Sequence, residues 1–388
     1  MIKKNNKTII TLNGIETNNK GAELMLYAIL QEIERKFPDA IIYLPLGAYQ
    51  KNLSYIKSAL NIRNIPFVSI RRFIIKSKIY GVLKLLGMEP SFIMANNFIK
   101  EVDYFLDASG FAISDQWNPT RSTIKSWKVL AKKYGKGNSK MIFLPQAFGP
   151  IKKKETKKII NLLNEYSDLI IARERESEKI LINANVNKTK IRRYPDFTNL
   201  VKGVINEKFI HLNNGICIIP NSRMFEKGAI SKDNYIKIIK FIIDTVKEFN
   251  HPVYILNHEG PSDEKLAYEI ASLYPDVVVV TGLNALEVKG VISTSYVCIS
   301  SRFHGVVSAL NSCVPCLATS WSHKYEELYK DYDLKDLMLK INDFTAMKNQ
   351  LLNICNPEIN LKIRNYLKIK NDDFLQLTKK MWEEIWNR

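Results

Sequence analysis

The sequence predicts an α/β fold in which two Rossmann-like domains face each other across a cleft. Short β-branched runs alternate with amphipathic helical stretches along the chain, which is the pattern of parallel sheets covered by helices. Polar side chains gather directly after the apolar runs, where ligands bind in such folds. A length of 388 residues, 46% of them hydrophobic, suits two domains rather than one.

The first half of the chain opens with an expected strand at residues 7–12 and a polar turn at 13–20. A helix is expected from Gly21, because apolar residues recur at every fourth position from Met25 to Phe37 and form one face. Further strands are expected at 40–44, 103–107, 141–144 and 168–172, each followed by polar or loop residues.

The second half repeats the alternation, with strands expected at 215–219, 253–256, 277–280, 296–300 and 316–319. A helical pattern such as 263–273 lies between successive strands. The polar, glycine-containing stretch 202–214 separates the two halves. We therefore expect an N-terminal domain at 1–202 and a C-terminal domain at 203–360. A helical segment at 361–388 should pack back on the protein.

The most informative segment follows the expected strand that ends at Ser300. Arg302 and His304 stand at the strand's carboxyl end, where a new helix begins. The free N–H groups and the dipole of a helix N-terminus both favour negative charge. Lys324 comes twenty residues after His304, at the start of another expected helix. Arg, His and Lys converging on one crevice predict a small anionic substrate and a proton donor.

The formal charge of +18 favours polyanionic partners. The lysines are scattered and no RNA-binding aromatic signature accompanies them, so we expect no nucleic acid partner. No apolar run approaches the roughly 18 residues that span a bilayer, and no signal peptide opens the chain, which predicts a cytoplasmic protein.

Residues 67–87 interleave bulky apolar side chains with cations, a combination that binds anionic membrane surfaces. We expect peripheral association with the inner face of the plasma membrane through this stretch. The competing interpretation is a half-buried helix with lysine on its wet face. The amphipathic stretch 374–386 is expected to pack on the protein instead.

The chain has five cysteines. Cys313 and Cys316 form a CxxC spacing, but no second CxxC or histidine pair completes a zinc site. The cysteines are best explained as small buried hydrophobic residues, and no metal is expected.

The chain carries polar motifs in the order Asn19–Glu23, Ala108–Phe111, Pro145–Pro150, Ala172–Ser177, Pro195–Asp196, Asn257–Asp263, Ser301–His304 and Lys324. Together they resemble the motifs of the polysaccharide pyruvyl transferase family. Asn19–Glu23 resembles the family's opening Asn-x-Gly-Asp-Glu turn, with Ala22 in place of the aspartate. Ser301–His304 resembles its Arg-x-His signature. The remaining matches are Ala108–Phe111, Pro145–Pro150, Ala172–Ser177, Pro195–Asp196, Asn257–Asp263 and Lys324. The resemblance extends from about Asn13 to about Leu334.

The resemblance implies a GT-B-like arrangement, with the acceptor on the N-terminal domain and the donor on the C-terminal one. It implies transfer of a pyruvyl unit from phosphoenolpyruvate to a sugar, lipid-linked or free, as a pyruvate ketal, with no cofactor. His304 would donate the proton. Arg173, Arg302 and Lys324 would bind the donor's two anionic groups, since arginine does this bidentately. The other expected substrate-binding residues are His258, Arg223, Asn19, Glu23 and Gln146.

The base that assists the acceptor hydroxyls stays open among Glu16, Glu23, Asp107 and Asp115. Two alternative functions also remain. One is a nucleotide-sugar glycosyltransferase of the same architecture, although the C-terminal half lacks a clear Glu-x7-Glu motif. The other is a non-catalytic glycan-assembly binding protein, against which the intact cationic residues argue.

Overall fold

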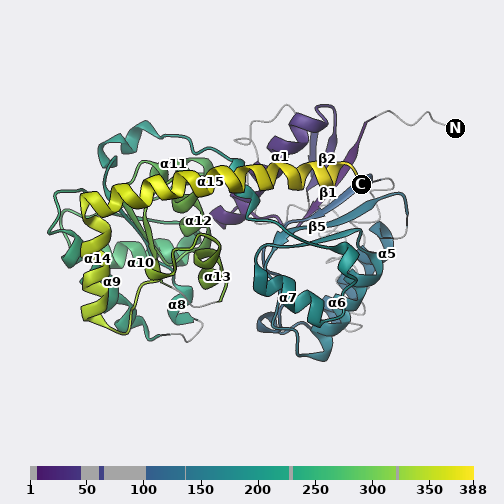
Figure 1. Cartoon of the computed structure of the whole chain (residues 1–388), viewed down its shortest axis with the longest axis horizontal. Coiled ribbons are helices and arrows are strands. Elements are labelled where there is room, and N and C mark those ends of the chain that lie inside the picture. Colours follow the sequence, from purple (N-terminus) through teal and green to yellow (C-terminus); the bar gives the residue numbers. More distant parts are fainter. Residues whose placement is uncertain (1–6, 45–60, 65–101, 136, 227–229, 320–322) are drawn as a thin grey trace, which may run out of the picture. The chain divides into compact units, whose positions relative to one another are not determined.

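The computed structural model describes residues 7–44, 61–64, 102–135, 137–226, 230–319 and 323–388. The chain divides into two compact units (Figure 1). Unit 1 comprises Met1–Thr17, Met25–Phe197 and Lys380–Arg388. Unit 2 comprises Asn18–Leu24 and Thr198–Lys379. The division therefore falls after Phe197 rather than after residue 202. The C-terminal helix is shared between the units rather than forming a segment of its own.

In the described part of unit 1, the sheet has seven parallel strands in the order β3-β2-β1-β4-β5-β6-β7. The strands are β1 (Ile9–Asn13), β2 (Ile41–Leu44), β3 (Asn61–Asn64), β4 (Tyr104–Asp107), β5 (Lys140–Gln146), β6 (Leu169–Ala172) and β7 (Ile191–Arg193). The helices are α1 (Lys20–Lys36), α5 (Arg121–Tyr134), α6 (Lys154–Tyr166) and α7 (Arg175–Asn183). Apolar side chains of α5 and α6 enter one core cluster, so both helices cover the same face of the sheet.

The described part of unit 2 holds a five-stranded parallel sheet in the order β10-β9-β8-β11-β12. The strands are β8 (Ile216–Ile219), β9 (Val253–Leu256), β10 (Val278–Val280), β11 (Val297–Ser300) and β12 (Cys316–Ala318). The helices are α8 (Arg223–Glu226), α9 (Lys232–Val246), α10 (Gly260–Ala271), α11 (Ala285–Ser293), α12 (Phe303–Asn311), α13 (His323–Asp331) and α14 (Phe344–Cys355). Two parallel sheets flanked by helices confirm the predicted α/β class.

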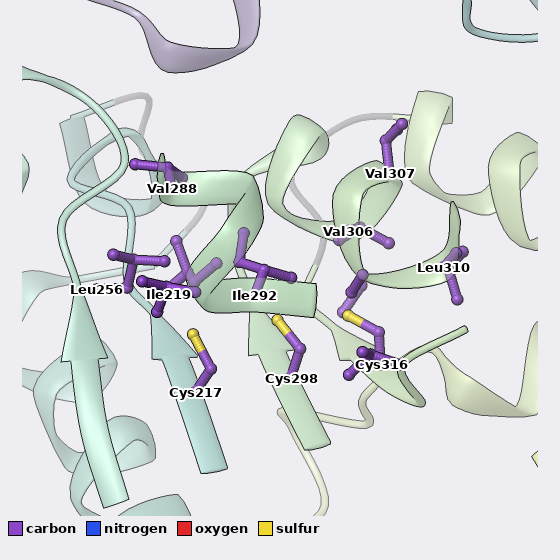
Figure 2. Packing of buried hydrophobic residues seen from close by; sticks show 14 of the residues in the cluster. Cys217, Ile219, Leu256, Val288, Ile292, Cys298, Val306, Val307, Leu310 and Cys316 are labelled. Atoms are coloured by element: carbon purple, nitrogen blue, oxygen red, sulfur yellow. The ribbon is translucent and has the colours of Figure 1, made fainter. Parts of the chain in front are cut away.

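Three cysteines lie side by side in the core of unit 2 (Figure 2). Cys298 on β11 is in register with Cys217 on β8 and with Cys316 on β12, and all three are fully buried free thiols. α11 and α12 cover them with apolar side chains such as Val288 and Val306. Hydrogen bonding to its two neighbours and burial raise the pKa of Cys298. These three cysteines are therefore small buried hydrophobic residues of the core, as predicted. Cys313 is half-buried.

The C-terminal helix α15 (Pro357–Trp386) contributes to both units. Within unit 2, its Leu367 is buried in the core cluster. Within unit 1, the Trp386 ring packs edge-on against Tyr104, with 5.3 Å between the ring centroids. Residues of this helix are thus buried in each of the two units.

Among the described residues, none of the helices combines the length and the apolar character needed to cross a bilayer. Residues 67–87, for which we predicted membrane association, lie outside the described part of the chain.

Candidate active site

Hydrogen bonds to the side chain and the backbone carbonyl of Ser301 hold the turn between β11 and α12 in place. The Ser301 hydroxyl lies 2.7 Å from the Tyr235 hydroxyl, and the Ser301 carbonyl accepts a hydrogen bond from the Tyr325 hydroxyl at 2.8 Å. Burial raises the pKa of Tyr235 to about 12, so this hydroxyl remains protonated. Arg302 therefore begins α12 from a rigid support, with its backbone N–H donating to Ser300 Oγ.

The Arg302 guanidinium is held by two carboxylates of unit 2. Its Nε and Nη2 donate to both oxygens of Asp263, each at 2.7 Å, and its Nη1 donates to Glu259. The Asp263 side chain is 1% exposed and that of Glu259 is 21% exposed, so Asp263 is the fixed partner and Glu259 the accessible one. Burial opposes the charge of Arg302, but hydrogen bonds and attraction from Asp263, then Glu259, raise its pKa overall. The guanidinium is thus an ordered cation whose charge is already offset.

The first turn of α1 packs in unit 2 against the loop that follows β9. Asn19 Nδ2 donates to Glu259 Oε2 at 3.1 Å, and the backbones of these two residues form an antiparallel bridge. Asn19 Oδ1 accepts hydrogen bonds from the N–H groups of Gly21 and Ala22, which caps the helix. Asn19 therefore acts on the site through Glu259.

Gly21 makes room for His304. A Cβ atom at position 21 would lie 2.1 Å from His304 Nδ1, well inside any contact distance. His304 is half-buried at the start of α12, and its ring lies edge-on to Phe303 at 5.4 Å between centroids. The proton-donor candidate is therefore confined between the first turns of α1 and α12.

His258 is buried near Arg302, His304 and Lys20. Burial, followed by the charges of Arg302, His304 and Lys20, lowers the pKa of His258 well below its usual value, so its imidazole is neutral. Within the described residues, His258 Nδ1 has no hydrogen-bond partner. A neutral imidazole with a spare ring nitrogen can bind a ligand or exchange a proton.

Lys324 lies in the same neighbourhood, at the start of α13. Its amine is 5.1 Å from the centroid of the Phe303 ring, the ring that also contacts His304. Arg223 follows β8 and forms a partly exposed ion pair with Glu226 at 3.1 Å. Both cations therefore belong to unit 2, as Arg302 and His304 do.

Glu23 is fully buried, and its carboxylate binds two different partners in unit 2. Its Oε2 pairs with Lys20 at 2.6 Å, and its Oε1 accepts a hydrogen bond from the Ala285 N–H at the start of α11. This carboxylate therefore fastens the first turn of α1 to α11. Both oxygens being occupied, Glu23 is a poor candidate for the acceptor base.

Unit 1 has a polar cluster of its own at the carboxyl ends of β1, β4 and β5. Asp107 accepts hydrogen bonds from Asn13 Nδ2 at 2.7 Å, from Gln146 Nε2 at 3.0 Å and from Ser109 Oγ at 3.0 Å. Burial raises the pKa of Asp107, and these hydrogen bonds partly oppose the rise. Gln146 Oε1, also buried, has no hydrogen-bond partner among the described residues.

Arg173, also in unit 1, is buried and pairs with Asp196 at 3.2 Å. Since Arg302, Lys324 and His304 belong to the other unit, the shared donor pocket stays a prediction.

The other base candidates differ in their surroundings. Asp115 is tied to the start of α6 by Thr156 Oγ1 at 2.6 Å and by the Lys152 N–H at 2.6 Å. Burial raises the pKa of Asp115, but these hydrogen bonds lower it overall, which suits a structural cap rather than a base. Glu16 is exposed. Asp107 is thus the candidate whose surroundings favour accepting a proton.

Sequence reasoning missed Glu259, Lys20 and Gly21 as parts of this site. Glu259 and Asp263 are four residues apart across the start of α10, a spacing that places two carboxylates on one side. That spacing could have indicated a paired arginine. The contact between Gly21 and His304 has no signal in the sequence.

The two-unit architecture belongs to the GT-B class of folds, as comparison with solved structures shows. MnaA from S. aureus, solved with UDP, superposes with a TM-score of 0.61 at 12% identity, covering 93% of this chain and 90% of that one. HepE from Anabaena, in complex with UDP and glucose, gives 0.59 at 11% identity over 98% and 100%. The trehalose-6-phosphate synthase OtsA gives 0.58 at 10% identity over 98% of each chain.

The family follows from the sequence match. A family profile described as polysaccharide pyruvyl transferase matches residues 19–323, which include the Asn19–Glu23 turn and the Arg302–His304 segment. The chain belongs to the polysaccharide pyruvyl transferase family. No curated protein matches it in a sequence search.

Proposed function

We propose that the protein transfers a pyruvyl unit from phosphoenolpyruvate to a sugar of a surface polysaccharide or of its precursor, forming a cyclic pyruvate ketal. The observation that carries this proposal is the rigid Arg302–His304 segment at the start of α12, in a chain of this family. A helix N-terminus with a neighbouring arginine favours anions, and a histidine beside it can supply a proton near neutral pH.

In this mechanism His304 protonates the methylene carbon of phosphoenolpyruvate. An adjacent anion favours the protonated form of the imidazole. The second carbon becomes oxocarbenium-like, and a sugar hydroxyl attacks it. A second hydroxyl then displaces phosphate and closes the ring. The two hydroxyl protons that are released balance the proton taken up by carbon and the one carried away by phosphate, so no redox partner is needed.

We propose that the donor's anionic group takes the position at Arg302 Nη1 that Glu259 now occupies. Glu259 holds one nitrogen and is partly exposed, whereas Asp263 holds two and is buried. Lys324, near Phe303, would bind the second anionic group as a compact charge. His258 would accept or relay a proton through its spare Nδ1.

For the acceptor we propose the polar cluster of unit 1, with Asp107 as the group that draws the hydroxyl proton. Because Asp107 is buried, the contact would run through the half-buried Ser109 hydroxyl, which donates to it. The acceptor would be lipid-linked or free. We further propose that the protein works in the cytoplasm, at the inner face of the plasma membrane.

A second candidate is a nucleotide-sugar glycosyltransferase. It is favoured by the GT-B architecture and by the UDP that MnaA and HepE carry in their solved structures. The two candidates differ in the donor and in the leaving group.

One experiment separates the candidates. The purified protein is incubated with a panel of sugars and either phosphoenolpyruvate or UDP-sugars, while released phosphate and UDP are measured. Phosphate release that requires both phosphoenolpyruvate and a sugar, with a ketal product identified by mass spectrometry, supports the first candidate. UDP release supports the second. Absence of both under conditions where the donor binds contradicts both enzymatic proposals.

A further inference from the structure

Unit 1 carries a dense basic surface on α5, α6 and the residues that lead into α6. The exposed lysines on the α6 side are Lys152, Lys153, Lys154, Lys157 and Lys158. On α5, the exposed cations Arg121, Lys125, Lys128 and Lys132 follow one another at intervals of four, three and four residues. This spacing aligns them in one stripe along the helix. We call these nine residues the α5/α6 basic face.

The two helices present this face on one side of unit 1. Both insert their apolar side chains into the same core cluster on one face of the unit 1 sheet, so their exposed, charged sides point away from that sheet. α5 contains no acidic residue, and α6 contains Glu155 and Glu165. Positive charge therefore dominates over the length of α5, which is roughly 21 Å for its 14 residues.

An exposed aromatic side chain borders the basic face. Trp117 is 44% exposed, and its Nε1 donates to the Phe111 carbonyl at 2.7 Å, which fixes the indole. The short turn that carries Trp117 is joined to the start of α6, because Asp115 accepts hydrogen bonds from the Lys152 N–H and from Thr156 Oγ1, both at 2.6 Å. The turn that carries Trp117 is thus held next to the residues that begin α6.

We propose that the α5/α6 basic face, together with Trp117, is a docking surface for an anionic phospholipid membrane. Cations of this density are attracted to acidic headgroups, and tryptophan prefers the interface between headgroups and acyl chains. One fixed tryptophan at the edge of a lysine-rich face suits a bilayer better than a nucleic acid, whose single strands require several stacking rings. The inference rests on the proposed location at a membrane and is independent of the proposed reaction.

The test compares two variants of the full-length protein that lose the same number of charges. The docking variant carries Arg121→Gln, Lys125→Gln, Lys128→Gln and Lys132→Gln. The control carries Lys237→Gln, Lys240→Gln, Lys348→Gln and Lys362→Gln, four exposed lysines of unit 2. Sedimentation with phosphatidylcholine vesicles, with and without phosphatidylserine, gives the partition coefficient at low and high salt. Circular dichroism verifies that both variants fold.

We expect the wild type to bind only the phosphatidylserine vesicles, and to release them as salt rises. Each cation near such a surface contributes roughly five-fold to partitioning, so the docking variant should lose at least about 100-fold while the control binds like the wild type. Vesicles with brominated acyl chains should quench wild-type tryptophan fluorescence more than that of Trp117→Phe.

Three outcomes would overturn the proposal. The first is a wild type that ignores phosphatidylserine vesicles at low salt, including one that binds a DNA oligonucleotide instead. The second is an equal loss of binding in the docking and control variants, which would reflect net charge alone. The third is binding that persists in the docking variant but disappears when Arg71, Arg72, Lys76 and Lys78 are replaced by glutamine. Phosphate release on a soluble sugar, measured in parallel, tests the reaction separately.

Discussion

Replacing Glu259 with glutamine should strengthen the binding of an anionic donor, whereas the matching change at Asp263 should weaken it. Both carboxylates bind the Arg302 guanidinium, and both substitutions remove one negative charge with little change in shape. The two residues differ in exposure and in the number of hydrogen bonds they accept from the guanidinium. The pair of variants therefore separates the carboxylate that the donor displaces from the carboxylate that holds the arginine.

The expected magnitudes follow from the surroundings. Two unit charges in contact near a protein surface attract by about 4 kcal/mol at an effective dielectric constant of 20, and solvent screening at the partly exposed Glu259 reduces this. In the wild type, a donor anion must displace Glu259 from Arg302, which costs about 1–2 kcal/mol. Without this cost, the anion should bind roughly 5- to 30-fold more tightly to Glu259→Gln. Asp263→Asn removes one partner of a buried pair, which costs about 3–5 kcal/mol of folding free energy.

The assay is steady-state phosphate release with phosphoenolpyruvate as the varied substrate, supported by calorimetric binding and by thermal melting. Glu269→Gln is a control, because this carboxylate of unit 2 pairs with Lys232 at 2.8 Å and has no contact with Arg302. A KM that rises as much in Glu259→Gln as in Asp263→Asn would refute the reasoning. It would mean that Glu259 is needed to hold the guanidinium and is not exchanged for substrate.

Three further predictions concern the histidines. His304→Ala should lower turnover by roughly 10²–10⁴-fold with little loss of stability, and near-normal phosphate release by the folded variant would exclude His304 as the acid. Gly21→Ala should lower both turnover and melting temperature, since its Cβ would meet His304 Nδ1 at 2.1 Å. Adding His304→Ala should restore part of the melting temperature, because the ring is removed while the His304 Cβ stays at 2.9 Å, and additive effects would contradict the contact. His258 is neutral in the folded state because burial and neighbouring cations depress its pKa, so the unfolded state binds a proton more readily as pH falls below about 6.5. The wild type should therefore lose about 1.4 kcal/mol more stability than His258→Gln between roughly pH 7.5 and 5.5, and denaturant unfolding that shows parallel losses in the two proteins would contradict the depressed pKa.

The strands that sequence predicted best are those buried on both faces. Val253–Leu256 was predicted to the residue, because a β-branched apolar run is bounded by Pro252 and by polar residues. The two strands that were missed, β3 and β7, stand at the edges of the unit 1 sheet. Their sequences, Asn-Ile-Arg-Asn and Ile-Arg-Arg, have neither an apolar run nor a clear alternation. Edge strands need fewer buried side chains, and in β3 and β7 the pattern that identifies central strands is weak, whereas β10 and β12 at the edges of the unit 2 sheet have apolar runs and were predicted.

In the candidate active site, the sequence predicted the local features but not the contacts between distant residues. The order of the polar residues after the strands predicted that Arg302 and His304 begin a helix, because this depends on local sequence. The pairing of Arg302 with Asp263 and Glu259 was not predicted, since these carboxylates stand 39 and 43 positions earlier in the chain. The spacing of Glu259 and Asp263 indicates a pair of carboxylates, but which cation they bind depends on long-range contacts that the spacing does not specify.

The Asn19–Glu23 turn, expected to bind substrate, positions the residue that we propose as the proton donor, His304. Asn19 caps α1 and holds Glu259, Gly21 leaves the space that the His304 imidazole fills, and Glu23 fastens the turn to α11. The residue types suit these roles, because an amide both donates and accepts, glycine has no Cβ, and a carboxylate favours a helix N-terminus. The same contacts explain why Asn18–Leu24 group with unit 2, although the rest of α1 belongs to unit 1. We infer that Asn19 and Glu23 act through Glu259 and His304 rather than by touching the donor, so their substitution should change turnover mainly by misplacing the imidazole.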